Sequence, residues 1–592
     1  MVERAAGGDV VAVVPDTCNV YVLRLGGRAI AIDFGAGTVL DRLAELGVDR
    51  ITDVLVTHHH RDQVQGLARA AEHGARIWAP PLEADAIAGV DLHWQCRRLD
   101  QDYDLREDRF SLRSAVELAG PVPEYRTQTF GDFVVYTLPT PGHTIGSVTY
   151  LVELEGRTLA FTGDLVYGDG RVWSLAATQW TYSGVEGQAS TVLSAKVLAR
   201  RAPDVLLPSH GPAIEQPIEA LETLARRMTE LIELRLGHAS GLSERIAEPY
   251  AAVTPHLLRS RVAFANSHVL VSDSGGALVF DFGFDSTPWQ RALLWSIDAL
   301  KERYGVDRIE AVIPTHYHDD HVAGIGLLRA VEGAELWAPA NVAPILEDPH
   351  RYDLPCLWPE PLPVDRVLEL EQSFTWEEYE LSVHAFPGHT LYAAAVGFEV
   401  DGRRVVATGD QYAFTDDRVL LNYQYRNGFR RGDYAKSALL LDEIEPDLAI
   451  SGHWLPAALD GSLRAELREA GERVALLHEQ LLPDEGLGEQ GFAARIEPYR
   501  SEVAGGATLE LEVAIRNPFA RAERATVVLA TPEGFEASPG TATVDLGAHE
   551  EAVVRFTLRP GDGPVRRARI AADVTIGSAR FGEQAEALVT IA

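Results

Sequence analysis

The hydrophobic pattern alternates between short strand-like runs and longer amphipathic stretches. Residues 10–33 form two apolar runs separated by the turn Gly26-Gly27. Residues 38–47 then place apolar side chains at helical spacing, and residues 51–58 form another apolar run. Short runs bounded by glycine predict strands, whereas a spacing of three to four predicts a helix. Strands that alternate with helices, with polar residues at the strand ends, predict a layered α/β architecture.

The same pattern returns later in the chain. Residues 262–281 repeat the two apolar runs, residues 287–303 repeat the helical stretch, and residues 309–316 repeat the following strand. Short motifs then recur in the same order, namely Pro141-Gly142-His143-Thr144 with Pro387-Gly388-His389-Thr390, Thr162-Gly163-Asp164 with Thr408-Gly409-Asp410, and Ser209-His210-Gly211 with Ser451-Gly452-His453. Self-similarity over this length predicts a tandem duplication, with copy one at residues 8–235 and copy two at residues 255–482.

The last part of the chain has a different pattern. From residue 503 to residue 592, short runs alternate apolar with polar residues, and glycine and proline separate them. This spacing predicts an antiparallel β-sandwich. We expect linkers at residues 236–254, between the two copies, and at residues 483–502, before the sandwich.

Composition excludes several classes of function. The formal net charge of −34 argues against nucleic acid or an anionic membrane as a partner, because both would be repelled. The three cysteines lie far apart without a CxxC pair, which is typical of reduced thiols. The sequence contains no apolar run of membrane-spanning length and no signal-peptide pattern at its start. We therefore expect a cytoplasmic protein that acts on a small molecule.

The densest chemical motif is the stretch Thr315–Gly324, which holds the pattern His-x-His-x-Asp-His. It follows a predicted strand and precedes a predicted helix. His316 and His318 therefore point to one side, and Asp320 and His321 point to a second place nearby. Imidazole and carboxylate groups together suit zinc, with iron and manganese as alternatives. The motif therefore predicts a metal site in copy two.

Copy two contains enough ligands for two metal ions. One group would comprise His316, His318 and His389, and a neighbouring group would comprise Asp320, His321 and His453. Asp410 follows an apolar strand, so its carboxylate could span both ions. Two cations at such a separation lower the pKa of a shared water and polarise a carbonyl or phosphoryl oxygen. Such a site needs no serine or cysteine nucleophile.

Copy one departs from this set at one position. Gln63 stands where copy two has His321, and an amide oxygen is a weaker ligand than imidazole. His58, His60 and His143 could still hold one metal, while Asp62, Asp164 and His210 could hold a second at reduced affinity. We expect an altered or mononuclear site here; a vestigial site kept for packing and a fully active one are the alternatives.

With these motifs the chain resembles the metallo-β-lactamase fold superfamily, twice over. The resemblance implies an αββα sandwich in each copy, with the site at one sheet edge. The Asp410 position is similar to the bridging aspartate of glyoxalase II-like and lactonase-like members. The resemblance thus implies a zinc-dependent hydrolase of a carboxylic ester, thioester or lactone that uses a metal-bridging hydroxide. His316, His318 and Asp320 would be its catalytic residues, with Asp320 orienting the hydroxide. The C-terminal sandwich resembles immunoglobulin-like modules.

Two other readings remain open. One is an oxidative enzyme with mononuclear iron, similar to persulfide dioxygenases, whose ligands would include Asp410. The other is a binding or assembly protein, in which copy one and the sandwich mediate association and the chain forms a homo-oligomer. Residues 352–363 would either roof the copy-two site or bridge strands. The aromatic residues after Asp410, such as Tyr412, Tyr423 and Tyr425, would either line a substrate pocket or pack against a neighbouring domain.

Overall fold

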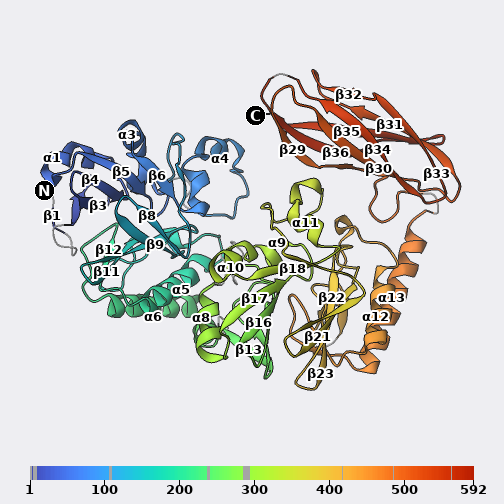
Figure 1. The fold of residues 1–592 in the computed structure, drawn as a ribbon, viewed down its shortest axis with the longest axis horizontal. Coiled ribbons are helices and arrows are strands. Elements are labelled where there is room, and N and C mark those ends of the chain that lie inside the picture. The colour runs from blue at the N-terminus through green and yellow to red at the C-terminus, as the bar shows by residue number, and fades with distance from the viewer. Residues whose placement is uncertain are drawn as a thin grey trace. The chain divides into compact units, whose positions relative to one another are not determined.

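A computed structural model describes most of the chain (Figure 1). The described residues are 3–4, 10–105, 110–236, 241–284, 294–415, 418–483, 486–561 and 563–591. The chain divides into two compact units, Met1–Glu248 and Pro249–Ala592. Residues 287–293 of the predicted copy-two helix lie outside the described residues, and helix α8 (Leu294–Arg303) forms the remainder.

The first unit contains two facing β-sheets. One sheet runs in the order β1 to β7, with bounds Glu3–Arg4, Val11–Pro15, Asn19–Leu25, Arg28–Ile32, Arg50–Leu55, Arg76–Ala79 and Gly120–Pro121. The other runs β12, β11, β10, β9, β8, with bounds Val205–Pro208, Arg157–Gly163, Val148–Leu154, Phe133–Pro139 and Arg126–Phe130. One buried apolar cluster takes its side chains from both sheets, which shows that the sheets pack face to face.

Helices cover the outer faces of these two sheets. They are α1 (Leu43–Leu46), α2 (Arg61–Val64), α3 (Leu67–Glu72), α4 (Val90–Cys96), α5 (Glu186–Arg200), α6 (Pro217–Leu236) and α7 (Leu242–Ala247). Leu67 and Ala70 of α3 join an apolar cluster on the outside of the first sheet. Val192 of α5 and Leu221 of α6 join another on the outside of the second sheet. The layers are therefore helix, sheet, sheet, helix, as predicted.

The second unit repeats this topology. Its first sheet runs from β13 to β19, with bounds Tyr250–Thr254, Leu257–Ser260, His268–Val271, Gly276–Phe280, Arg308–Ile313, Glu335–Pro339 and Arg366–Leu368. Its second sheet runs β20, β21, β22, β23, β26, β27, with bounds Gln372–Trp376, Tyr379–Ala385, Ala394–Val400, Arg403–Ala407, Leu448–Ile450 and Ala457–Ala458. In both units the first sheet changes from antiparallel to parallel pairing at its fourth strand. The shared order confirms the duplication.

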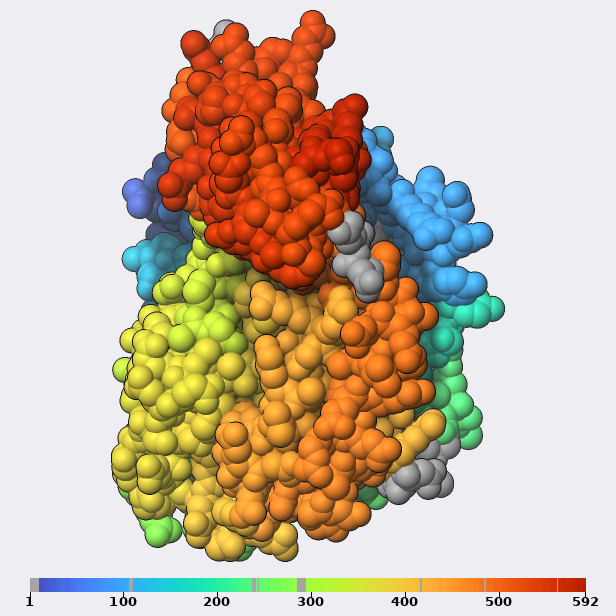
Figure 2. Space-filling view, turned by 90° about the vertical axis from the view of Figure 1, so that its right-hand side faces the viewer, coloured from blue at the N-terminus to red at the C-terminus, as the bar shows by residue number. Residues whose placement is uncertain are grey.

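Helices again cover the sheets of the second unit. Besides α8 they are α9 (Asp319–Val322), α10 (Ile325–Glu332), α11 (Ala343–Glu347), α12 (Asp433–Ile444) and α13 (Gly461–Leu481). Tyr434 and Leu441 of α12 and Leu467 of α13 enter the outer apolar cluster. The opposite side of these two helices faces solvent, and α13 (orange) contributes to the surface seen in Figure 2. A short two-stranded sheet, β24 (Tyr412–Phe414) and β25 (Val419–Leu421), follows β23.

The C-terminal region is all β, as predicted. Its four-stranded sheet runs β28, β30, β34, β32, with bounds Ala494–Glu497, Leu509–Arg516, Glu551–Arg559 and Glu536–Ser538. Its five-stranded sheet runs β29, β36, β35, β31, β33, with bounds Arg500–Val503, Ala579–Ile591, Val565–Ile576, Glu523–Ala530 and Thr541–Leu546. A buried apolar cluster fills the space between the two sheets.

The segments predicted as linkers contain regular structure. Within residues 483–502, β28 pairs with β30, and β29 pairs with β36 of the sandwich. Within residues 236–254, α7 and β13 form, and β13 pairs with β14 of the second unit. Four- and five-residue strands bordered by proline are too short to produce a clear alternating pattern. Among the described residues, no helix is both long enough and apolar enough to cross a membrane.

Candidate metal centres

The sequence-predicted ligands of copy two meet at one edge of its two sheets. His316 and His318 follow β17, and α9 begins directly after His318. His389 follows β21, Asp410 follows β23, and His453 follows β26. Because all these strands end at the same edge, residues up to 137 positions apart along the chain come together there. We call this arrangement site 2, and its counterpart in copy one site 1.

Three imidazoles of site 2 converge on one point. His318 Nδ1 lies 3.0 Å from His316 Nε2 and 3.3 Å from His389 Nε2. The three rings are buried, and burial lowers the pKa of His316 well below its usual value and that of His318 to about 3. The rings are therefore neutral at pH 7, and lone pairs of neutral rings at this separation are best satisfied by a shared cation. The arrangement fits the predicted three-histidine metal group.

The second group of site 2 lies beside the first. His453 Nε2 is 3.1 Å from Asp320 Oδ2 and 3.2 Å from Asp410 Oδ2, while His321 Nε2 is 3.3 Å from Asp410 Oδ1. His389 Nε2 lies 3.8 Å from Asp410 Oδ2, so the Asp410 carboxylate faces both groups. Burial lowers the pKa of His453, but Asp320 and Asp410 raise it to about 9. Two carboxylates that converge on one imidazole suit a metal cation between them.

Further groups hold the site 2 ligands in orientation. His321 Nδ1 lies 2.9 Å from Asp281 Oδ2, and the backbone N–H of Thr315 donates to Asp281 Oδ1 at 2.7 Å. The other nitrogen of His389, Nδ1, lies 2.6 Å from the carbonyl oxygen of Asn422. A carboxylate or carbonyl partner on the second ring nitrogen fixes the tautomer that leaves the first nitrogen free to bind metal. The structure thus brings together the predicted ligands of site 2 and the groups that would orient them.

Substitution of Asp281 tests this support. We expect Asp281→Asn to weaken the second metal of site 2 by about 10- to 100-fold, because His321 loses the carboxylate that orients its ring. The corresponding Asp33→Asn variant in copy one is the matched control, since Gln63 has no second ring nitrogen to orient. Titration with a chelator of known zinc affinity measures both variants. Equal losses in the two variants would contradict the role assigned to Asp281.

Site 1 repeats the three-imidazole group. His143 Nε2 lies 2.9 Å from His60 Nδ1 and 3.4 Å from Asp164 Oδ2, and His58 Nε2 lies 3.7 Å from Asp164 Oδ2. Burial lowers the pKa of all three histidines, most strongly those of His58 and His60. The same chemistry as in site 2 therefore applies, and these residues fit one metal ion.

The second group of site 1 differs in its histidine. His210 follows Ser209 directly, whereas in copy two Gly452 separates Ser451 from His453. The His210 ring spans two carboxylates, with Nδ1 at 2.7 Å from Asp164 Oδ1 and Nε2 at 3.3 Å from Asp62 Oδ2. It also stacks on Trp173 at 4.2 Å between ring centroids. Burial lowers the pKa of His210, but Asp164 and Asp62 raise it to about 10.

Gln63 occupies the place of the missing histidine. Its side chain is fully buried, and its amide nitrogen as assigned lies 3.3 Å from Asp164 Oδ2. The swapped amide donates instead to Asp62 Oδ1 at 2.6 Å and to the His60 carbonyl at 3.3 Å, which leaves the amide oxygen facing Asp164. In neither orientation does the Gln63 amide offer the imidazole nitrogen that His321 places beside Asp410 in copy two.

Comparison with known proteins agrees with this geometry. The family model described as Metallo-beta-lactamase superfamily matches residues 13–230 and again residues 261–453. The chain belongs to this superfamily. In both metallo-β-lactamase copies the predicted ligands lie at the sheet edge. Among the described residues, the clusters of histidine and acidic side chains that could hold a metal are the four groups given above, with Asp410 in the first.

Curated relatives of the chain include hydroxyacylglutathione hydrolases. One from Methylobacterium nodulans is 36% identical over 140 residues, which are 23% of this chain and 43% of the relative. Another from Methylobacterium sp. strain 4-46 is 37% identical over 150 residues, 25% of this chain and 47% of the relative. The chain thus spans about half the length of these relatives. Among solved structures, a B3 metallo-beta-lactamase with an active-site glutamic acid is 22% identical, covers 40% of this chain and 91% of its own, and has a TM-score of 0.32.

One buried pair in the first metallo-β-lactamase copy escaped the sequence analysis. His59 lies between two predicted ligands, and its ring and its backbone N–H both contact the Glu83 carboxylate. Thr144 Oγ1 donates to the other Glu83 oxygen at 2.9 Å. In the second copy, Tyr317 takes the place of His59 and its hydroxyl donates to Asn427. A glutamate 24 residues from its histidine gives no signal in a single sequence.

The Glu83 carboxylate predicts an acid-dependent loss of stability. Burial raises its pKa, but the ring and backbone N–H of His59, together with Thr144, lower it to about 2, below the 4.5 of an unfolded glutamate. Its stabilising contribution is therefore complete above pH 4.5 and disappears as the pH falls toward 2, on the order of 3 kcal/mol in all. We expect Glu83→Gln to remove most of this pH dependence, measured by denaturant unfolding of metal-free protein, whereas the exposed control Glu222→Gln keeps it. Identical curves for parent and Glu83→Gln would contradict the prediction.

The aromatic residues that follow Asp410 pack rather than line the metal site. Tyr412 is fully buried against Phe386 and Tyr434. Tyr425 donates to or accepts from His478 Nε2 at 3.0 Å, on α13. In copy one Trp173 reaches the site through its stacking on His210, and the Phe110 ring centroid lies 6.2 Å from that of His60.

Proposed function

We propose that the chain is a zinc-dependent hydrolase whose competent centre is site 2. The observation that carries this proposal is the convergence of both predicted ligand groups on Asp410. Its carboxylate faces His321 at 3.3 Å, His453 at 3.2 Å and His389 at 3.8 Å. Zinc bound there would lower the pKa of a water and polarise a carbonyl oxygen.

The chain's own residues suit hydrolysis around such a centre. Asp320 and His453 are the more exposed ligands, with side chains 16% and 26% exposed, so substrate approaches from their side. Burial raises the pKa of Asp320, but His321 and His453 lower it below its usual value. Asp320 is therefore ionised, and its carboxylate can orient a water molecule and accept its proton. The buried histidines exclude bulk solvent from the opposite side of the centre.

We infer that the substrate is a carboxylic thioester, with esters and lactones as related candidates. Hydroxyacylglutathione hydrolases, named for a thioester substrate, are among the curated relatives of this chain. In such a reaction water adds to the carbonyl carbon, the C–S bond breaks, and the acid and the thiol leave. The proton accepted by Asp320 balances the charge on the departing sulfur.

Site 1 is proposed to be the weaker centre. It keeps its three-histidine group, but Gln63 replaces an imidazole and His210 spans both carboxylates through its two nitrogens. Both changes reduce the affinity for a second ion, and without that ion the site supplies less stabilisation of a leaving anion.

A substrate panel tests the proposal. Zinc-loaded protein is assayed with thioesters, oxoesters, lactones, phosphodiesters and β-lactams, and the His316→Ala variant serves as the blank. We expect hydrolysis of thioesters above the blank, and little turnover of phosphodiesters or β-lactams. Turnover that is unchanged in the blank, or confined to phosphodiesters or β-lactams, would overturn the proposal.

A further inference from the structure

The loop at residues 352–363 connects the site 2 ligands with the C-terminal sandwich. It follows a short 3-10 turn, Pro349–Arg351, and precedes β19. Residues 349–357, which we call the bridging segment, contact sandwich strands of the same unit at one end and the metal-binding motif at the other.

Backbone contacts join the bridging segment to the metal ligands. The Asp319 N–H donates to the Cys356 carbonyl at 2.8 Å, and His318 forms an isolated β-bridge with Leu357. Asp319 stands between the two ligands His318 and Asp320. Any shift of Cys356 or Leu357 therefore moves the backbone that aims both ligands.

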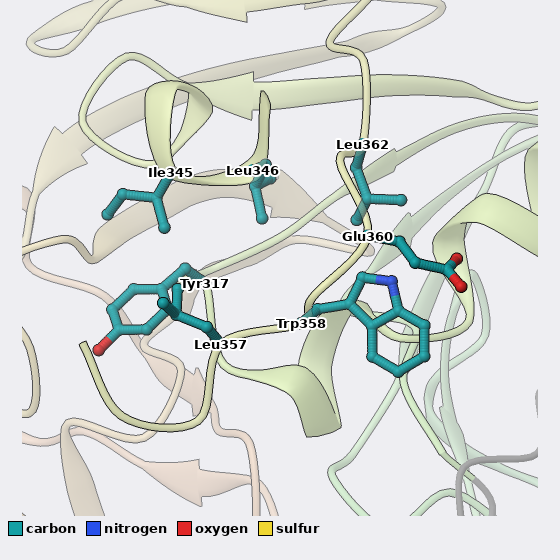
Figure 3. Close-up of a pocket in the computed structure, with 7 residues that line it drawn as sticks. All are labelled: Tyr317, Ile345, Leu346, Leu357, Trp358, Glu360 and Leu362. Carbon is teal, nitrogen blue, oxygen red and sulfur yellow. The ribbon is translucent and has the colours of Figure 1, made fainter. Parts of the chain in front are cut away.

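Apolar packing reinforces this end of the segment. Tyr317, which lies between His316 and His318, is fully buried. Figure 3 shows its ring beside Leu357, on one side of a narrow pocket whose opposite side is formed by Ile345 and Leu346 of α11. The pocket is too tight to hold a ligand, so its lining acts as packing between the segment and the metal-binding motif.

The other end of the segment is fixed by the sandwich. Arg351 Nε lies 2.8 Å from Glu497 of β28, and an Arg351 terminal nitrogen lies 2.8 Å from Glu512 of β30. The Tyr499 N–H donates to the Arg351 carbonyl at 3.0 Å, and the Tyr499 carbonyl accepts from Leu588 of β36 at 2.7 Å. Arg351 thus has two side-chain partners on the four-stranded sandwich sheet. Its backbone partner, Tyr499, is hydrogen-bonded to the five-stranded sheet.

We propose that Arg351 is a positioning residue for site 2, and that the sandwich holds His318 and Asp320 in place through it. This inference rests on the proposed function. A single exposed ion pair contributes little, but Arg351 combines two carboxylates with a backbone hydrogen bond, and Glu512 is itself held by Arg555 at 3.0 Å. In this role the all-β region helps to position the predicted ligands of site 2.

In copy one, described residues of the equivalent loop, among them Asp104, Leu105 and Ser111, contact residues of the same domain. There Leu105 donates to the Trp180 carbonyl at 2.7 Å, and Asp104 forms a β-bridge with Thr181. Arg61, which begins α2 beside the ligand Asp62, donates to the Ser111 carbonyl at 3.0 Å. These contacts of the copy-one loop are made with residues of copy one itself.

The test uses the full chain with His58→Ala and His60→Ala, so that site 2 is the intact centre. Into this background we introduce Arg351→Ala, Glu497→Gln with Glu512→Gln, and all three changes together. Arg308→Ala is the matched control, since Arg308 also pairs with two glutamates, Glu310 and Glu377, at the opposite end of β17. Cobalt(II) affinity and its visible spectrum report the metal site, and hydrogen exchange of metal-free protein reports residues 315–324 and 352–362.

We expect about tenfold weaker cobalt binding and faster exchange of both segments in Arg351→Ala, by analogy with the loss of outer-shell partners. Cobalt affinity should fall by the same factor in the variant with Glu497→Gln and Glu512→Gln. The triple variant should show no further loss, because all three side chains act through one contact. Unchanged exchange together with unchanged affinity in Arg351→Ala would overturn the inference, and so would an equal change in Arg308→Ala. If the background chain binds no cobalt at all, the proposed function fails, while hydrogen exchange still decides the role of Arg351.

Discussion

Replacing His316 and His318 with alanine is expected to abolish hydrolysis, whereas replacing His58 and His60 leaves most of it. The first pair supplies two of the three imidazoles that converge in site 2. Their loss removes the cation that would polarise the carbonyl, so kcat/KM should fall by at least about 1,000-fold. The second pair belongs to site 1, whose second ligand group is altered, and its loss should cost less than about threefold.

Two measurements separate this asymmetry from a general loss of folding. Each double variant is compared with the parent by thermal unfolding of metal-free protein, in which the truncated histidines hold no ion. Kinetics are then measured with the thioester that the parent turns over best. Equal loss of kcat/KM in the two double variants would contradict the assignment of activity to site 2.

The sixth position of the histidine motif is His321 in copy two and Gln63 in copy one. Exchanging these residues should weaken binding of the second metal in site 2 and strengthen it in site 1. His321→Gln removes the imidazole 3.3 Å from Asp410 and leaves Asp281 without its ring partner. We expect its second metal to bind at least about 100-fold more weakly, because losing a ligand costs more than losing the partner that orients it, and thioester turnover should fall with it. Gln63→His adds an imidazole at a buried position beside Asp164, and should tighten the second metal of site 1.

The Gln63→His variant should regain only part of the second-metal affinity of site 2. His210 still spans Asp62 and Asp164 through both ring nitrogens and still stacks on Trp173. We therefore expect its second-metal affinity to rise about tenfold and to stay below that of site 2. Zinc competition with a chromogenic chelator measures each variant, with the other site disabled by its histidine-pair substitution. Affinity that does not change in either exchange would contradict the importance of this position.

The architecture was predictable because it repeats and because strands and helices have different periods. Two series of motifs in the same order indicated the duplication, and each predicted ligand now lies at one sheet edge of its copy. Alternation alone predicts the sandwich, but β28 and β29 have only four residues each, too few to distinguish them from a linker.

Side-chain partners across long sequence separations were not predictable. In the sequence His210 follows Ser209 directly, whereas Gly452 separates Ser451 from His453. This difference does not predict how the His210 ring is placed. Only the fold shows that the earlier histidine bridges two carboxylates. Arg351 lies 146 positions from Glu497, and no local pattern marks an arginine that joins one domain to another. Such contacts depend on packing, which periodicity does not encode.

The metal content of the chain with His58→Ala and His60→Ala tests the central claim most directly. The protein is purified without added metal, equilibrated with buffered zinc, and analysed by inductively coupled plasma mass spectrometry beside the His316→Ala, His318→Ala variant. Seven side chains form the two groups of site 2, and we expect them to hold about two zinc ions per chain. One iron ion in place of zinc, or no metal retained, would contradict a dinuclear zinc centre in copy two.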